Sequence, residues 1–311
     1  MNVIVFGAAG FIGTNLALKL IKKENIILTL VDVAEDYFVD ELKDYSNIKI
    51  GISDFDKDTN FDEMLENQDV VYHLVSNVVP ASSGVDVYHE IESNVGVTAK
   101  LLDACVRCNV KKVVFVSSGG TVYGREVACP IKETADTNPI TSYGIQKLAI
   151  EKLLYFYNYK FGLDYRVIRL ANPYGNYQRP NGVLGVIVNF VYKALKKEPI
   201  TIYGDGSVIR DYIYIDDAIE AILKIVAFEG NDKIFNLGSG VGISIKEVLE
   251  ILEKILDEKL NVTYMPSRAF DVPVNYLDMS RYEKEVGATN FISLEDGINK
   301  TIDYIKKNYL N

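Results

Sequence analysis

A tyrosine and a lysine stand four residues apart, at Tyr143 and Lys147, in a stretch with helical spacing. Side chains four residues apart share one face of a helix. An ammonium group beside a phenol favours the phenolate, so Lys147 is expected to lower the pKa of Tyr143 and let it act as a general base. The pair follows a hydroxyl-rich segment, residues 117–123, which favours a catalytic role over a chance match among the 21 tyrosines.

A glycine-rich turn follows the first apolar run of the chain, residues 2–6. Its residues are Gly7, Gly10, Phe11, Ile12 and Gly13. Glycines in such a turn let the backbone approach a pyrophosphate, and the N-terminus of the helix that follows offers free N–H groups. About 20 residues further on, Asp32 ends a second apolar run, where its carboxylate can bind the adenosine ribose and disfavour a 2′-phosphate. The turn and the acid together predict an NAD site.

The elements that must position these residues alternate along the first half of the chain. Apolar runs that predict buried strands fall at residues 2–6, 26–31, 70–75, 113–116 and 165–170. Long helical segments are predicted at about 85–108 and 142–161. Strands that alternate with helices specify a doubly wound parallel sheet, so the fold class is α/β and Rossmann-type.

After about residue 171, loop signals and shorter elements predict a smaller, partly interleaved α/β domain. These elements are a helix near 216–228, a strand at 233–237, a helix near 244–256 and a helix near 293–308. We therefore expect an NAD-binding domain over 1–171, with contributions from about 207–237. A substrate-binding domain is expected over 172–206 and 238–311.

The composition restricts the alternatives. The 311 residues carry a net charge of −10, and a pI near 4.9 argues against a nucleic-acid binder, because Lys and Arg hold phosphate backbones. Only His73 and His89 supply imidazole, which disfavours a histidine-rich zinc site, and no metal site is predicted. Cys105, Cys108 and Cys129 are interpreted as unpaired, which suits a reducing cytoplasm. No apolar run approaches the roughly 18–20 residues of a membrane span, so we expect a cytoplasmic protein without membrane or nucleic-acid partners.

Taken together, the motifs resemble the extended short-chain dehydrogenase/reductase family, specifically its NAD-dependent nucleotide-sugar epimerases and dehydratases. The resemblance covers nearly the whole chain. It is carried by the glycine turn, Asp32, Asp54, His73-Leu74-Val75, Asn94, Ser117-Ser118 with Val122-Tyr123-Gly124, the Tyr143 and Lys147 pair, and Arg169 with Asn172-Pro173-Tyr174-Gly175. UDP-glucose and UDP-N-acetylglucosamine 4-epimerases are the most similar members.

The resemblance implies roles on the cofactor side. Tyr143 is the catalytic base, and Lys147 binds the nicotinamide ribose while lowering the tyrosine pKa. Further contacts to the cofactor are implied at Asp54, Phe55, Leu74 and Asn94. His73 is implied to be structural, in agreement with its apolar neighbours in the sequence.

One position departs from the family pattern. Epimerases commonly carry a Ser or Thr three positions before the Val of Val-Tyr-Gly, where this chain has Gly119. The hydroxyl that bridges the sugar 4-OH and the tyrosine is then expected from Thr121 first and Ser118 second, unless Thr121 only packs and water replaces it. The 4,6-dehydratases place Asp and Glu where this chain has Gly120 and Thr121, which disfavours dehydration.

On the substrate side, the resemblance implies contacts from both halves of the second domain. The residues implied are Asn172, Tyr203, Arg210, Arg268, Asp271 and Asn275. Guanidinium groups suit diphosphate oxygens, and Asn275, smaller than the tyrosine that galactose-type epimerases carry there, is expected to admit an N-acetyl group.

The expected activity is epimerisation at C4 of a UDP-hexose or UDP-N-acetylhexosamine, by transient oxidation to a 4-keto sugar and return of the hydride. A dehydratase or reductase of the same family is the alternative, and a non-catalytic NAD-binding regulatory protein is a remote one. A homodimer is also implied, in which the helices near 85–108 and 142–161 form a four-helix bundle. Its apolar candidates are Leu101, Leu102, Leu148, Ile150, Leu153 and Leu154, which core packing could equally use.

Overall fold

The computed structural model describes residues 1–43, 45–78, 83–180, 185–267, 272–288 and 290–310. Its centre is a seven-stranded parallel sheet in the order β10-β6-β5-β4-β1-β2-β3. The strands are β1 (Asn2–Phe6), β2 (Ile27–Asp32), β3 (Ile48–Ile52), β4 (Val70–His73), β5 (Lys112–Ser118), β6 (Asp164–Leu170) and β10 (Ile234–Leu237). The inner strands are short apolar runs that bury side chains on both faces of the sheet. The edge strand β3 contains no fully buried residue.

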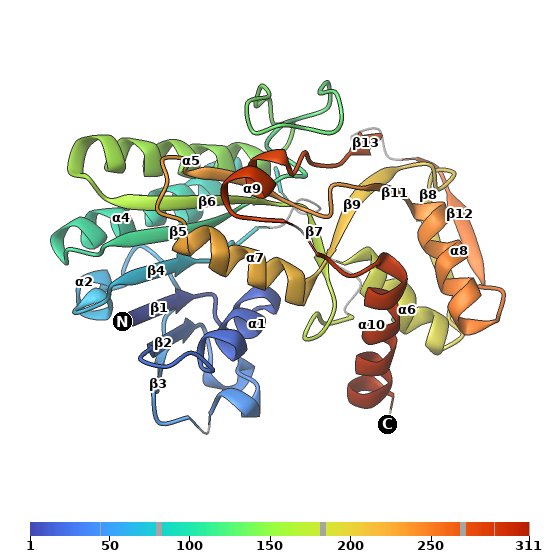
Figure 1. The fold of residues 1–311 in the computed structure, drawn as a ribbon, viewed down its shortest axis with the longest axis horizontal. Coiled ribbons are helices and arrows are strands. Elements are labelled where there is room, and N and C mark those ends of the chain that lie inside the picture. The colour runs from blue at the N-terminus through green and yellow to red at the C-terminus, as the bar shows by residue number, and fades with distance from the viewer. Residues whose placement is uncertain (44, 79–82, 181–184, 268–271, 289, 311) are drawn as a thin grey trace.

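Helices cover both faces of this sheet (Figure 1). On one face lie α1 (Phe11–Leu20) and α7 (Ile215–Ala227), which pack into one large core with the substrate-side elements. On the other lie α2 (Phe61–Leu65), α4 (Val97–Arg107) and α5 (Ser142–Phe161), around a second core. The predicted doubly wound, Rossmann-type fold is confirmed.

The long helix expected at about 85–108 is interrupted. It consists of α3 (Val87–Ile91), a π-helical turn (Glu92–Gly96) and α4. Asn94 lies in the π-helical turn, where its buried side chain accepts a hydrogen bond from the backbone N–H of Asn77 at 2.9 Å and donates to the carbonyl of Glu90 at 2.9 Å. Wide turns of this kind are frequent at functional sites, because they redirect a side chain.

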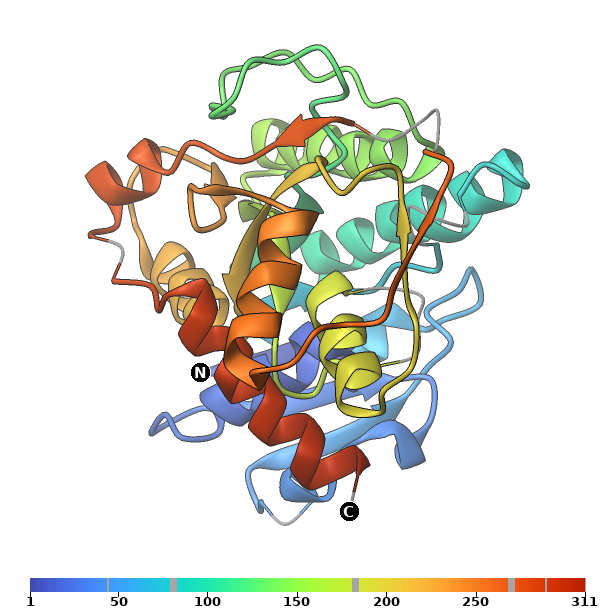
Figure 2. The same ribbon diagram turned by 90° about the vertical axis from the view of Figure 1, so that its right-hand side faces the viewer.

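Within the described ranges, the smaller part of the molecule contains two further sheets and four helices. One sheet consists of β7 (Asn172–Tyr174), β9 (Ile209–Tyr214), β11 (Gly242–Ser244) and β13 (Val274–Asn275), and the other of β8 (Ile200–Tyr203) and β12 (Val262–Met265). The helices are α6 (Val186–Leu195), α8 (Ile245–Leu256), α9 (Ser280–Glu285) and α10 (Leu294–Tyr309). In Figure 2, α8 and α10 face the viewer beside the sheet that contains β9 and β11.

The predicted contribution of about 207–237 to the first domain covers β9, α7 and β10. Strand β9 pairs with β7, β11 and β13 in the smaller sheet. Helix α7 covers the large sheet, and β10 extends its edge beside β6. Among the described residues, no helix has both the length and the apolar character needed to cross a membrane.

Candidate active site

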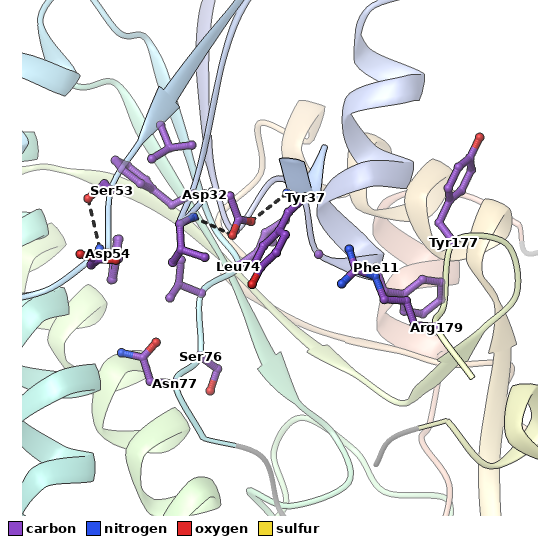
Figure 3. A pocket seen from close by; sticks show the side chains of 18 of the residues that line it. Phe11, Asp32, Tyr37, Ser53, Asp54, Leu74, Ser76, Asn77, Tyr177 and Arg179 are labelled. Carbon is purple, nitrogen blue, oxygen red and sulfur yellow. Dashed lines mark hydrogen bonds between the residues drawn. The ribbon is translucent and has the colours of Figure 1, made fainter. Parts of the chain in front are cut away.

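A cavity of about 470 Å³ opens at the carboxyl ends of β1, β2, β3 and β4, where the strand order reverses (Figure 3). Ligands of doubly wound folds bind at this switch point. The described lining includes seven residues that the sequence predicts, which are Gly7, Gly10, Phe11, Asp32, Asp54, Phe55 and Leu74. The sequence analysis missed several others, among them Tyr37, Ser53, Asn77, Tyr177 and Arg179.

The glycines of the first turn are required by close contacts. Gly7 has a φ of +80°, and a Cβ there would lie 3.2 Å from the carbonyl carbon of Leu74. A Cβ at Gly13 would lie 2.2 Å from the carbonyl oxygen of Gly7, so Gly13 serves the packing of α1 on β1 and does not line the cavity. Ile12 also lies outside the lining.

The carboxylate of Asp32 is fixed by the backbone around it. One oxygen accepts a hydrogen bond from the N–H of Ala9 at 2.8 Å, and the other from the N–H of Val33 at 2.9 Å. Each carboxylate oxygen can accept a further bond, so two ribose hydroxyls can be held, while a 2′-phosphate would meet a like charge. The glycine turn, the N-terminus of α1 and Asp32 therefore fit NAD.

The other predicted cofactor residues reach the cavity in different ways. Asp54 is exposed at its rim. Phe55 also lines the cavity, and its ring packs edge-on against Phe6 with the ring centroids 5.3 Å apart. Asn94 holds the backbone of Asn77, a lining residue, and does not itself line the cavity.

His73 is buried below the site. Its Nε2 hydrogen-bonds the hydroxyl of Thr98 at 2.8 Å, and burial lowers its pKa to about 3, so the ring is neutral at physiological pH. This agrees with the structural role that the resemblance implies.

Tyr143 and Lys147 lie in the first turns of α5. Thr141 caps the start of the helix, because its hydroxyl accepts a hydrogen bond from the N–H of Gly144 at 3.1 Å. A Cβ at Gly144 would lie 2.8 Å from the carbonyl oxygen of Thr121, so the start of α5 packs directly on the turn after β5. This contact brings Thr121 into the neighbourhood of Tyr143.

The pKa of Tyr143 is shifted in the direction opposite to the predicted one. The half-buried phenol has its pKa raised to about 12 by burial. Lys147 is itself buried, donates to the carbonyl of Val116 at 3.0 Å and lies over the ring of Phe115. Burial lowers the pKa of Lys147 to about 8, with Glu151 acting to raise it. Desolvation of both groups therefore outweighs the attraction that the spacing alone suggests.

Replacing Lys147 with Met should raise the free energy of unfolding near pH 7 by up to about 3 kcal/mol. The folded-state pKa of Lys147 lies below its ordinary value of 10.5. The cost of burying the charge is therefore complete below about pH 8 and disappears as the pH rises toward 10.5. Urea unfolding of wild type and Lys147→Met across this range should show the difference in stability shrinking. A pH-independent difference would contradict the shift.

Close packing favours a glycine at position 119. A Cβ there would lie 2.6 Å from Cδ1 of Leu277 and 3.0 Å from the carbonyl oxygen of Arg169. A serine or threonine at this position would therefore require Leu277 to shift. The buried hydroxyl oxygen of Thr121 has no hydrogen-bond partner among the described residues, which favours Thr121 over Ser118 as the replacement.

Gly119→Ala should lower the free energy of unfolding by roughly 1–3 kcal/mol, the usual effect of overpacking a buried site. Gly120→Ala is the matched control, because a Cβ there meets only the hydroxyl of Ser118 at 3.8 Å. Equal stability of the two variants, measured by urea unfolding, would show that Leu277 yields without cost.

The structure describes some of the residues that the sequence predicts to contact the substrate. Asn172 donates from its amide to the carbonyl of Asp211 at 2.8 Å. Arg210 donates to the carbonyls of Ile209 and Val272, and its strand β9 pairs with β13 so that it stands opposite Asn275. Tyr203 is exposed at the end of β8. The predicted contacts Arg268 and Asp271 lie outside the described residues.

Asn275 lies closer to the catalytic segment than the sequence indicates. It is 1% exposed, and its amide donates to the carbonyl of Gly119 at 3.2 Å. Its side-chain oxygen has no partner among the residues that the structure describes. An acceptor is therefore left buried beside the turn that carries Thr121.

A buried ion pair that the sequence analysis did not identify holds α5 in place. The carboxylate of Glu151 accepts from Nη2 of Arg169 at 2.7 Å and from the hydroxyl of Ser117 at 2.6 Å. Arg169 also donates to the hydroxyl of Tyr123 at 3.0 Å. Glu151 stands one turn beyond Lys147 on α5, but only the three-dimensional structure reveals that β5 and β6 supply its partners.

No group of three or more His, Cys, Asp or Glu side chains suited to a metal ion occurs within the described ranges. Cys105, Cys108 and Cys129 carry free thiols, as the sequence predicts.

Comparisons with known proteins identify the family that the chain matches. Residues 3–238 match the family described as "NAD dependent epimerase/dehydratase family". The chain is 32% identical to a UDP-glucose 4-epimerase of Mycolicibacterium smegmatis, covering 98% of this chain and 99% of that protein. It is 31% identical to a dTDP-4-dehydro-6-deoxyglucose reductase of Escherichia coli, covering 98% of each.

The fold comparison agrees as well. The crystal structure of a UDP-glucose 4-epimerase from Thermotoga maritima with UDP-glucose superposes with a TM-score of 0.91, at 33% identity and covering 99% of each chain. A family match over most of the chain, a Rossmann-type fold of the same shape and a cavity that fits the dinucleotide point the same way. The chain belongs to the NAD dependent epimerase/dehydratase family.

Proposed function

We propose that this protein is an NAD-dependent epimerase that inverts C4 of a UDP-hexose or UDP-N-acetylhexosamine. The observation that supports the proposal is the packing of α5, which carries Tyr143 and Lys147, on the turn after β5, where the hydroxyl of Thr121 has no hydrogen-bond partner among the described residues. The same turn has Gly120 and Thr121 where a dehydratase needs an acid and a base. Oxidation at C4 is thus supported by the residues present, and elimination of water is not.

In the proposed reaction, Tyr143 accepts the proton of the sugar 4-OH, with Thr121 bridging the two hydroxyls. NAD, when bound, would supply the reversible hydride acceptor that inversion at C4 through a 4-keto sugar requires. Lys147, held by the carbonyl of Val116, binds the nicotinamide ribose and places positive charge beside the phenol. Because burial raises the pKa of Tyr143 to about 12, this charge is needed to make proton transfer feasible.

We place the substrate on the smaller part of the molecule, over 172–206 and 238–311. Asn172, Arg210 and Arg268 are proposed to hold the diphosphate, with Tyr203 and Asp271 on the nucleoside. Asn275 is proposed at C2 of the sugar, where its buried, unpartnered oxygen could accept the N–H of an N-acetyl group. This placement favours acceptance of both plain and N-acetylated sugars.

The second candidate is a reductase of the same family. The similarity to the Escherichia coli dTDP-4-dehydro-6-deoxyglucose reductase supports it, because that relative covers the chain as completely as the epimerases do. A reductase consumes reduced cofactor in proportion to product, whereas an epimerase does not. The balance of cofactor therefore separates the two candidates.

A panel of sugar nucleotides tests the proposal. The purified protein is incubated with UDP-glucose, UDP-galactose and their N-acetylated forms in the presence of NAD, and with a dTDP-4-keto sugar in the presence of NADH, and products are followed by NMR. Interconversion of a C4 epimer pair without net change in NADH supports the epimerase. Conversion of the keto sugar alone, with loss of NADH, would establish the reductase in its place.

A homodimer and a cytoplasmic location are also proposed. Of the predicted interface residues, Leu101, Leu102, Ile150 and Leu154 are buried within the protomer, so they belong to its own core. The same helices leave other apolar and aromatic side chains exposed, which are Tyr88, Ile91, Ile145, Tyr155, Phe156 and Tyr159. These support a helix-to-helix interface, and light scattering should give twice the 34.9 kDa of one chain.

A further inference from the structure

The segment 176–179, which follows β7, crosses from the smaller sheet to the mouth of the NAD cavity. Three of its residues, Tyr177, Gln178 and Arg179, line that cavity together with residues at the ends of β1, β2, β3 and β4. The sequence shows only loop signals in the stretch after about residue 171. Its contribution to a cavity of the first domain therefore has no signal in local sequence.

Contacts from three directions hold the segment in place. The amide of Asn15 on α1 donates to the carbonyl of Asn176 at 2.9 Å. Tyr177, which has a φ of +67°, packs its ring on Tyr304 of α10 with centroids 5.3 Å apart. Its hydroxyl donates to Glu41 at 3.5 Å. These contacts fix the backbone at Asn176 and Tyr177, immediately before the residues that line the cavity beside Tyr37.

Arg179 stacks on Tyr37, which belongs to the turn after β2. The guanidinium carbon lies 5.6 Å from the ring centroid of Tyr37, within the range of a cation–π contact. In Figure 3, Tyr37 lies beside Asp32 and the guanidinium end of Arg179 points toward it. An arginine from the substrate side thus meets a residue five positions after the ribose-binding acid.

The charges of the cavity make this arginine distinctive. NAD carries a diphosphate, yet the charged residues of the described lining are Asp32, Asp54 and Arg179, so Arg179 is the one cation among them. Helix α1 offers backbone N–H groups and a partial positive charge at the glycine turn. A planar guanidinium that stacks on an aromatic ring adds a fixed, fully charged donor for diphosphate oxygens.

We infer that Arg179, braced by Tyr37, binds the diphosphate of NAD and slows its release, so that one cofactor serves many turnovers. The inference rests on the proposed NAD-dependent function and deepens it. It assigns to the segment 176–179 a role in retaining the cofactor, contributed by the part of the chain that otherwise holds the substrate. Tyr37 acts through Arg179 as a positioning residue.

The rate of NAD release tests the inference without any turnover. Wild type, Arg179→Ala, Arg179→Lys, Tyr37→Ala and the double variant are loaded with NAD, and its exchange for labelled NAD is timed. Arg179→Ala should release NAD roughly 10- to 100-fold faster, the range for a hydrogen bond to a charged group. Tyr37→Ala should accelerate release by roughly two- to fivefold, since it removes a cation–π brace, and Arg179→Lys should fall between wild type and Arg179→Ala.

Controls separate this role from general effects. Arg107→Ala removes an exposed arginine that pairs with Asp62 on the outside of the helical layer, and its release rate should equal that of wild type. High salt should accelerate release from wild type more than from Arg179→Ala, because salt screens the charge. The double variant should release NAD more slowly than the product of the two single-variant accelerations predicts, because Tyr37 acts through Arg179.

Two results would overturn the inference alone. One is an Arg179→Ala release rate equal to that of wild type, and the other is an acceleration with the same salt dependence in both proteins, which would mean that Arg179 acts only by packing. Failure of wild type to bind NAD at all would overturn the proposed function together with the inference.

Discussion

Tyr143→Phe should lower kcat by roughly 10²- to 10⁴-fold, the usual contribution of a positioned general base. The phenyl ring retains the packing at the start of α5, so NAD and UDP-sugar affinities should stay within a few-fold of wild type. The loss therefore falls on kcat and not on KM. Initial rates of epimerisation, together with the NAD content of the purified variant, measure both quantities.

Tyr155→Phe is the matched control for this variant. Tyr155 lies on the same helix with its side chain 60% exposed, and it takes no part in the proposed site. Its turnover should equal that of wild type. Turnover by Tyr143→Phe at the wild-type rate would remove the tyrosine from the reaction, whatever the activity proves to be.

Glu151→Gln should lower the free energy of unfolding by about 3–5 kcal/mol, the range for breaking a buried ion pair. Glu151 and Arg169 are 2% and 3% exposed, so the substitution leaves a guanidinium charge buried without its carboxylate. The same carboxylate accepts from Ser117 on β5. Urea unfolding measures the loss, and kcat should fall as well because α5 carries Tyr143.

Two comparison variants test whether burial is the cause. Asp62→Asn breaks a similar bidentate arginine pair on the surface, with Arg107, and should change stability little. The double variant Glu151→Met with Arg169→Met removes both charges and should be less destabilised than Glu151→Gln. A double variant that is less stable than the single one would show that the hydrogen bonds of Arg169 to Tyr123 matter more than its charge.

Local sequence patterns sufficed for the features in which neighbouring residues act together. Apolar runs indicate the strands, and a glycine turn after the first of them indicates a phosphate-binding helix start. Asp32 and the Tyr143 and Lys147 pair are likewise recognised by spacing. The structure brings the glycine turn and Asp32 to one cavity and packs the pair against β5.

Features that depend on distant segments could not be predicted in this way. Arg179 reaches Tyr37 only because β7 leads out of the central sheet, and Glu151 meets Arg169 only because α5 lies across β5 and β6. The direction of the pKa shift of Tyr143 depends on burial, which the four-residue spacing does not reveal.

The structure differs from the sequence-based expectation at two further places, position 119 and the helix of about 85–108. Leu277, far along the chain, lies where a side chain at Gly119 would begin. The predicted helix of about 85–108 contains a π-helical turn at Asn94, whose side chain accepts a hydrogen bond from the backbone of Asn77. In both cases a tertiary contact overrides a local expectation.

Epimerisation of a UDP-hexose that carries deuterium at C4 tests the central claim most directly. If hydride leaves C4 and returns to it within one active site, the epimer should keep its deuterium at C4, in ordinary water, with no NADH released. NMR and mass spectrometry of the product read the label. Loss of deuterium to the solvent, or release of NADH in proportion to product, would contradict transient oxidation at C4 followed by hydride return.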